Sequence, residues 1–217
     1  MISKLHYITQ EVKGFTHASL AEKACKGGVD WVQLRIKDKP YEELKAQAIE
    51  TLYVCRKYGA KLIINDNVQL AKEIEADGVH LGKEDMNPAD ARQLLGNDFI
   101  IGGTANTFED IVKLVNAGVN YIGLGPYKFT ATKEKLSALL GIEGYLKIMK
   151  ACRVSNITVP VIAIGGIQQN DVDLLLETGL HGVAVASAIN LSNNIQLAAQ
   201  ELMGNVMKER EELLLNE

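Results

Sequence analysis

The clearest potential for chemistry in this sequence lies in a short polar segment at 33–37, with the sequence QLRIK. Alternate side chains of an extended chain share one side, so Gln33, Arg35 and Lys37 are expected to point the same way. Burying two cations together requires a compensating anion. The segment therefore predicts an anionic ligand, with internal salt bridges as the alternative.

Two aspartates, Asp66 and Asp85, follow two different apolar runs, at 61–65 and 78–81. A sparse carboxylate pair often holds Mg²⁺ while phosphate and water oxygens complete its shell. Either aspartate alone is also a good helix N-cap. Because both accompany the cationic segment, we interpret them as a Mg²⁺ site. His80 lies inside its apolar run, which favours a packed, hydrogen-bonded histidine over a catalytic one.

A second set of residues is typical of a phosphate site. Gly166 ends one apolar run and Ser187 follows the next, where backbone N–H groups and a hydroxyl can approach a phosphate. The long stretch after the sixth run adds Thr130, Thr132 and Lys133 as donors. A tight turn and a mobile surface loop are the alternatives. A diphosphate site and a monophosphate site together indicate a transferase acting on two phosphorylated substrates.

The elements that would position these residues alternate along the chain. Eight short apolar runs are each followed by helical periodicity, which predicts βα units and a parallel sheet. The runs are 5–9, 31–36, 61–65, 78–81, 100–104, 121–125, 161–164 and 182–186. Examples of the expected helical segments are 41–58, 68–75, 88–95, 108–116, 142–152 and 171–178.

Eight such units favour an α/β fold closed into a single (β/α)8 TIM barrel over residues 1–217, with a charged C-terminal tail near 208–217. A doubly wound open sheet is the alternative, but no GxGxxG follows the first run. Catalytic groups of a barrel lie at the C-terminal ends of its strands. Apart from His80, the polar residues above fall at those ends or in the segments that follow them.

Composition limits the function classes. The chain has 217 residues, 47% hydrophobic and 23% charged, as expected of a globular protein. A net charge of −4 argues against nucleic-acid or membrane partners. Three widely spaced cysteines suit a reducing cytoplasm, and no apolar run approaches the ~20 residues that span a bilayer. We expect cytoplasmic localisation and small-molecule phosphorylated substrates; a homo-oligomer is compatible with the sequence.

Six segments occur in an order that is specific as a set. They are 33–37 (QLRIK), 64–66 (IND), 76–85 (ADGVHLGKED), 121–126 (YIGLGP), 130–133 (TATK) and 163–167 (AIGGI). Together they span most of the chain, and the sequence resembles the thiamine-phosphate synthase (thiamine-phosphate pyrophosphorylase) family. The resemblance implies condensation of hydroxymethylpyrimidine diphosphate with thiazole phosphate, giving thiamine phosphate and pyrophosphate with Mg²⁺ as cofactor.

The resemblance also implies residue roles. Asp66 and Asp85 would hold the metal, and Arg35, Lys37 and Lys133 would be catalytic. The pyrimidine diphosphate would contact Gln33, Arg35, Lys37, Asn65, Thr104 and Lys133, and the thiazole phosphate would contact Thr130, Thr132, Gly166, Ala186 and Ser187. The family mechanism is dissociative: pyrophosphate leaves first, and the thiazole nitrogen attacks the resulting pyrimidinylmethyl cation.

The sequence departs from the family pattern at a few positions. Thr104 stands where Ser is usual, which keeps the hydroxyl, and Phe129 replaces a usual Pro. The segment 134–140 also differs, so the rigidity and closure of this loop need not follow the family's. A related thiazole tautomerase uses a histidine after the sixth strand, where this chain has Pro126 and Tyr127. That tautomerase and a non-catalytic phosphate sensor are the alternative functions.

Overall fold

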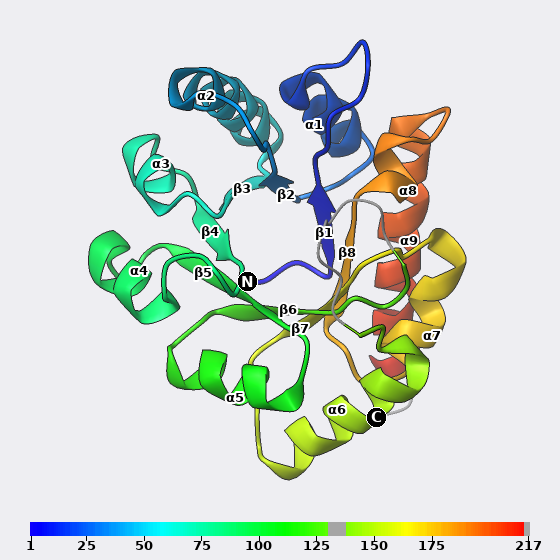
Figure 1. Ribbon diagram of the computed structural model, residues 1–217. Coiled ribbons are helices and arrows are strands. Elements are labelled where there is room, and N and C mark those ends of the chain that lie inside the picture. The colour runs from blue at the N-terminus through cyan, green and yellow to red at the C-terminus, as the bar shows by residue number, and fades with distance from the viewer. Residues whose placement is uncertain (130–137, 215–217) are drawn as a thin grey trace.

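In the computed structural model, which describes residues 1–129 and 138–214, strands and helices alternate around a central barrel (Figure 1). The strands are β1 (Leu5–Ile8), β2 (Trp31–Leu34), β3 (Lys61–Asn65), β4 (Gly78–Leu81), β5 (Ile100–Ala105), β6 (Tyr121–Leu124), β7 (Val161–Ile164) and β8 (Gly182–Val185). The α-helices are α1 (His17–Lys26), α2 (Tyr41–Tyr58), α3 (Val68–Glu73), α4 (Pro88–Leu95), α5 (Phe108–Asn116), α6 (Gly141–Val154), α7 (Val172–Leu176), α8 (Ser187–Asn190) and α9 (Ile195–Leu214). A 3-10 turn, Gln169–Asp171, precedes α7.

The strands form a closed parallel barrel in sequence order. Closure occurs between β1 and β8, where Leu5 pairs with Val183 and Tyr7 with Val185. This pairing confirms the predicted (β/α)8 fold and excludes the open doubly wound sheet. Among the described helices, none combines the length and apolar character needed to cross a membrane.

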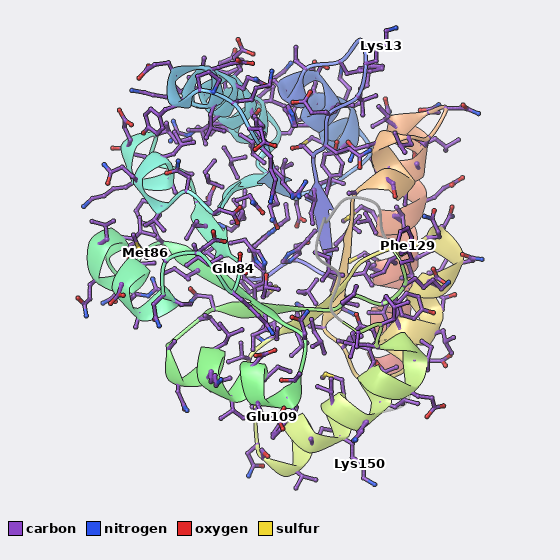
Figure 2. All side chains as sticks on the ribbon, in the orientation of Figure 1. Lys13, Glu84, Met86, Glu109, Phe129 and Lys150 are labelled. Carbon is purple, nitrogen blue, oxygen red and sulfur yellow. The ribbon has the colours of Figure 1, made fainter. Side chains whose placement is uncertain are left out.

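Alternation along each strand sorts the side chains into two apolar layers. Outward residues such as Leu5, Val32 and Leu62 pack against the surrounding helices in one large cluster. Inward residues such as Trp31 and Tyr121 form a second cluster inside the barrel. Charged side chains, among them Glu109 on α5 and Lys150 on α6, project from the outer faces of the helices (Figure 2).

Helix boundaries follow recognisable capping residues. Thr16 and Thr107 form capping boxes at the starts of α1 and α5, and Pro88 occupies the first turn of α4. Gly59 ends α2 in the left-handed conformation at φ 69°. The predicted bounds 41–58, 88–95 and 108–116 are those observed.

Other boundaries differ from the prediction for local reasons. The second strand ends at Leu34 instead of residue 36, because the Arg35 N–H donates to the Thr9 hydroxyl (3.1 Å). The helix predicted at 171–178 is preceded by the 3-10 turn and ends at Leu176. The charged run at 208–212 lies within α9, which continues to Leu214.

The barrel interior is filled by aromatic rings where neighbouring strands supply glycine. His6 stacks on Trp31 at 4.3 Å between ring centroids, and Tyr121 meets both rings edge-on. A Cβ on Gly102 would lie 2.2 Å from Tyr121 Cζ, so only glycine leaves room for this ring. Burial lowers the pKa of His6 well below its usual range. The interior is therefore a neutral, packed core, and polar chemistry is confined to the strand ends.

Candidate active site

The ends of β3 and β4 bring the two predicted metal ligands together. Asp66 takes φ 65° just after β3, and its N–H donates to the His80 carbonyl (2.9 Å). Asp85 is held by the Gly82 N–H, which donates to its Oδ2 (2.7 Å). Burial of Asp66 and its side-chain hydrogen bond to Asp85 raise the pKa of Asp66 to about 6. Two carboxylates forced this close favour a cation between them.

Cations from the end of β2 face the carboxylate pair. Arg35 is half-buried, and the loss of water around its guanidinium lowers its pKa. The negative charges of Asp66 and Asp38 partly offset this effect. Lys37 is exposed and acts on Asp66 through its charge. The structure thus brings Arg35 and Lys37 of the predicted diphosphate site together with Asp66 and Asp85, whereas Lys133 lies outside the described residues.

Two amide side chains lie deeper at the same end of the barrel. Gln33 is 4% exposed, and its Nε2 donates to Asn65 Oδ1 at 2.7 Å. This bond orients both amides relative to each other at the ends of β2 and β3. Thr104, on β5, has its hydroxyl 3.0 Å from His80 Nε2. His80 is 6% exposed, and its Nδ1 lies 3.0 Å from the Tyr121 hydroxyl. This confirms the prediction that His80 is packed and hydrogen-bonded.

The predicted monophosphate site falls at the ends of β7 and β8. Gly166 has φ 68°, and a Cβ there would lie 2.6 Å from the Phe129 carbonyl oxygen, so the approach of the two segments requires glycine. Ala186 and Ser187 follow the neighbouring strand, and Ser187 begins α8. Phe129 itself is 69% exposed (Figure 2). Thr130, Thr132 and Lys133 lie outside the described residues.

The donor set at β3 and β4 fits Mg²⁺. Over residues 1–129 and 138–208, no group of three or more His, Cys, Asp or Glu side chains could hold a metal. The carboxylate pair is thus an incomplete shell of hard oxygen ligands, as expected for an ion that takes its remaining ligands from phosphate and water. A hollow of about 390 Å³, lined by Asp66, Asn67, Val68, Gln69 and Met86, adjoins the pair.

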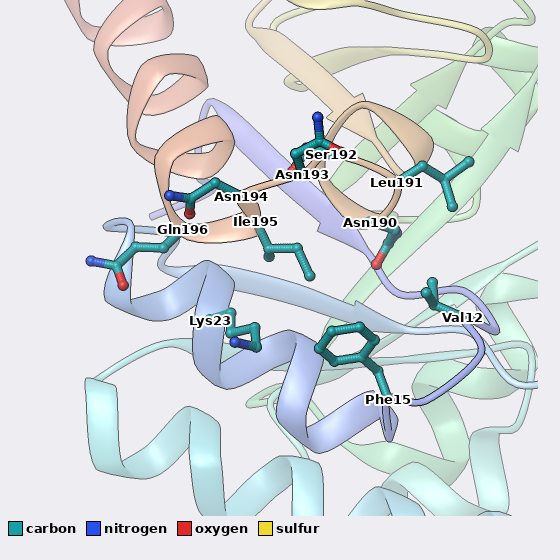
Figure 3. Close-up of a pocket in the computed structure, with 10 residues that line it drawn as sticks. All are labelled: Val12, Phe15, Lys23, Asn190, Leu191, Ser192, Asn193, Asn194, Ile195 and Gln196. Atoms are coloured by element: carbon teal, nitrogen blue, oxygen red, sulfur yellow. The ribbon is translucent and has the colours of Figure 1, made fainter.

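A larger hollow of about 550 Å³ lies between the segment after β1 and the start of α9 (Figure 3). It contains Phe15 and Lys23 on one side and Asn190 on the other, and none of the predicted site residues. Asn190 is buried and bonded to Tyr7 and to the carbonyls of Ile8 and Ala186. Its polar groups therefore support the fold, and we assign no ligand to this hollow.

Sequence reasoning missed two residues that support the site. Thr9 is fully buried; its hydroxyl accepts the Arg35 N–H and lies 2.7 Å from His17 Nδ1. Tyr121 reaches His80 from inside the barrel. Strand alternation could have placed Tyr121 inward with Gly123, but no local signal pairs it with a histidine 41 residues earlier.

Comparisons with known proteins agree with this geometry. A family model described as thiamine monophosphate synthase matches residues 5–189. The chain is 49% identical over 185 residues to a thiamine-phosphate synthase of Bacteroides thetaiotaomicron, covering 85% of this chain and 88% of that protein. It is 48% identical over 202 residues to a thiamine-phosphate synthase of Flavobacterium johnsoniae, covering 93% and 95% respectively.

A solved structure shares both the fold and the sequence pattern. The thiamine phosphate pyrophosphorylase from Pyrococcus furiosus superposes with a TM-score of 0.82 at 30% identity, covering 94% of this chain and 96% of that one. The same family is indicated by the closed barrel, by the matching family model and by the relatives at 48% and 49% identity. The chain therefore belongs to the thiamine monophosphate synthase family, whose activity as a transferase it shares.

Proposed function

We propose that this chain, acting as one domain, joins hydroxymethylpyrimidine diphosphate to thiazole phosphate and releases pyrophosphate. The observation that carries the proposal is the convergence of Arg35 and Lys37 with Asp66 and Asp85 at one end of the barrel. A monophosphate sensor needs neither a carboxylate pair nor two cations beside it. Tyr127 and Pro126 are buried where the tautomerase alternative needs a histidine.

The pyrimidine diphosphate is proposed to lie against the ends of β2 to β5. Arg35 and Lys37, with Lys133, bind the diphosphate as charge develops on it, and Gln33, Asn65 and Thr104 hold the pyrimidine end. Asp66 and Asp85 would hold Mg²⁺, which would supply further positive charge to stabilise the diphosphate. The half-buried position of Arg35 strengthens its interaction with an anion, because less water screens it.

The thiazole phosphate is proposed to bind at the ends of β7 and β8. Backbone N–H groups near Gly166 and Ala186 and the hydroxyl of Ser187 are suited to phosphate oxygens, and the hydroxyls of Thr130 and Thr132 are proposed as further contacts. Binding there would place the second substrate at the same end of the barrel as the first. Holding two substrates in line converts a bimolecular encounter into a unimolecular step.

The reaction needs no strong base. The bond between the pyrimidine methylene carbon and the diphosphate oxygen breaks, and its electron pair leaves with pyrophosphate. The thiazole nitrogen then donates its lone pair to the pyrimidinylmethyl cation, forming the new C–N bond. Cations placed at the leaving group lower the barrier to the first step. We assign this stabilisation of the departing pyrophosphate to Arg35, Lys37 and Lys133.

Metal and diphosphate should bind as one unit. We expect Mg²⁺ and pyrophosphate together to raise the Tm by more than the sum of their separate effects, because two carboxylates alone would leave ligand positions of the ion for diphosphate oxygens. Thermal unfolding with each ligand alone, with both, and with EDTA measures this synergy. Strictly additive shifts would contradict a shared site. Chelation should also stop turnover, and added Mg²⁺ should restore it.

A further inference from the structure

His80 connects the barrel core to the candidate substrate site. Its Nδ1 lies 3.0 Å from the Tyr121 hydroxyl oxygen, and its Nε2 lies 3.0 Å from the Thr104 hydroxyl oxygen. Tyr121 is 1% exposed and sits in the barrel interior, whereas Thr104 is half-exposed at the end of β5. A histidine held at both nitrogens has its proton positions set by its two neighbours.

The buried phenol decides which nitrogen carries the proton. Burial raises the pKa of Tyr121, so its hydroxyl stays protonated. Among the described residues, this hydroxyl forms its hydrogen bond with His80. If His80 Nδ1 carried the proton, the buried Tyr121 O–H would have no acceptor among the described residues, at the cost of its desolvation. Donation from Tyr121 to Nδ1 avoids this cost and leaves the imidazole proton on Nε2.

Packing holds the side chains of Tyr121 and His80 in the positions from which they reach Thr104. A Cβ on Gly102 would meet the Tyr121 ring, and a Cβ on Gly123 would lie 3.1 Å from His80 Cε1. The two glycines on β5 and β6 thus create the space for both rings. On its other side Tyr121 meets His6 and Trp31 edge-on, at 4.9 and 5.4 Å between centroids. Neither ring can turn away without displacing this core.

From this geometry we infer that Tyr121 and His80 are positioning residues for Thr104. Tyr121 donates to His80 Nδ1, and His80 Nε2–H donates to the Thr104 hydroxyl. With its oxygen occupied as an acceptor, Thr104 directs its own hydrogen outward as a donor. The inference rests on the proposed function, in which Thr104 contacts the pyrimidine diphosphate, and it assigns to that substrate an acceptor atom opposite Thr104.

The proton pattern can be observed without any activity. In protein labelled with nitrogen-15 in histidine, protonated and bare ring nitrogens have well-separated shifts, and His80→Gln identifies the signals of His80 among those of the four histidines. At about pH 8, where free histidine is neutral, we expect His80 to be protonated at Nε2 and bare at Nδ1. In Tyr121→Phe the two tautomers should mix. A proton on Nδ1 in the unmodified chain overturns the inference.

Kinetics test whether the pattern serves the substrate. Tyr121→Phe keeps the ring and removes one hydrogen bond, so we expect kcat/KM for the pyrimidine diphosphate to fall about 10-fold, with the KM for thiazole phosphate unchanged. In a Thr104→Val background the same change should cost nothing further, because the hydroxyl it orients is gone. His80→Gln, whose amide can still donate to Thr104, should retain more activity than His80→Leu.

Tyr145→Phe is the matched control. Its hydroxyl is also buried and donates to the Leu124 carbonyl (2.7 Å). The change therefore removes one buried hydrogen bond outside the relay, as we call the hydrogen bonds from Tyr121 through His80 to Thr104. We expect it to lower the Tm like Tyr121→Phe and to leave kcat/KM unchanged. Equal kinetic losses in both tyrosine variants, or additive losses with Thr104→Val, would reduce the relay to a structural role. Absence of product from the unmodified chain would instead overturn the proposed function, while the NMR result still decides the proton pattern.

Discussion

Asp66→Asn should lower turnover by about 10²–10³-fold while leaving the metal-free protein as stable as the unmodified chain, or more stable. Loss of one carboxylate removes half of the oxygen pair formed with Asp85. Asparagine also tolerates the left-handed φ of 65° at this position, so the backbone has no reason to change. The loss therefore falls on metal binding and chemistry.

The stability half of this prediction follows from the pKa of Asp66. Burial and Asp85 raise that pKa from 3.8 to about 6, so the folded protein binds this proton more tightly than the unfolded chain. The ionised group thus costs folding free energy that grows as the pH rises through that range. A neutral asparagine should recover about 1–2 kcal/mol at neutral pH in EDTA.

Urea unfolding in EDTA and steady-state turnover in Mg²⁺ measure the two halves. Asp77→Asn is the control, because Asp77 accepts the Leu62 N–H (2.8 Å) and pairs with Lys61 at the other end of the strands. We expect that variant to lose stability and keep its turnover. Parallel losses of stability and turnover in Asp66→Asn would argue that Asp66 is only a structural residue.

Arg35→Met should also reduce kcat by about 10²–10³-fold. The methionine keeps an apolar stem of similar length but removes the positive charge that a departing diphosphate needs. Arg35→Lys should recover part of the loss, because it restores a point charge without the two-pronged geometry of a guanidinium. Arg35 is half-buried, so replacing it should change the free energy of unfolding by less than about 1 kcal/mol.

Arg92→Met is the control for Arg35→Met, because it removes an arginine that lies outside the candidate site. Arg92 donates to the carbonyls of Gly96 and Phe99 and to Asn120 Oδ1, so it ties α4 to the start of β5. We expect Arg92→Met to lower the Tm and to leave kcat within about twofold, since this end of the barrel serves stability. Turnover of Arg35→Met equal to that of Arg92→Met would contradict a role at the diphosphate.

The architecture was predictable because strand and helix periodicities repeat eight times along the chain. Runs such as Val161–Ile164, apolar at every position, indicate strands buried on both faces. Seven of the eight predicted runs contain the observed strand, and β5 extends one residue beyond its run, to Ala105. The boundary at Leu34 was not predictable, because it depends on the Thr9 hydroxyl, which approaches only after folding.

The site was predictable to the extent that a barrel gathers its strand ends. Arg35, Asp66 and Asp85 carry the signal in their own residue types, so their convergence followed from the fold. The hydrogen bonds from Tyr121 through His80 to Thr104 did not follow, because they connect three strands and no local pattern pairs these residues. Only the three-dimensional register shows which hydroxyl faces which nitrogen.

The most direct test of the account is to measure pyrophosphate and thiamine phosphate together, using purified protein with both substrates, with each alone, and with Mg²⁺ or EDTA. We expect equal amounts of both products, formed only when both substrates and Mg²⁺ are present. Absence of product from protein that binds thiazole phosphate would contradict it. So would pyrophosphate released with no thiamine phosphate formed.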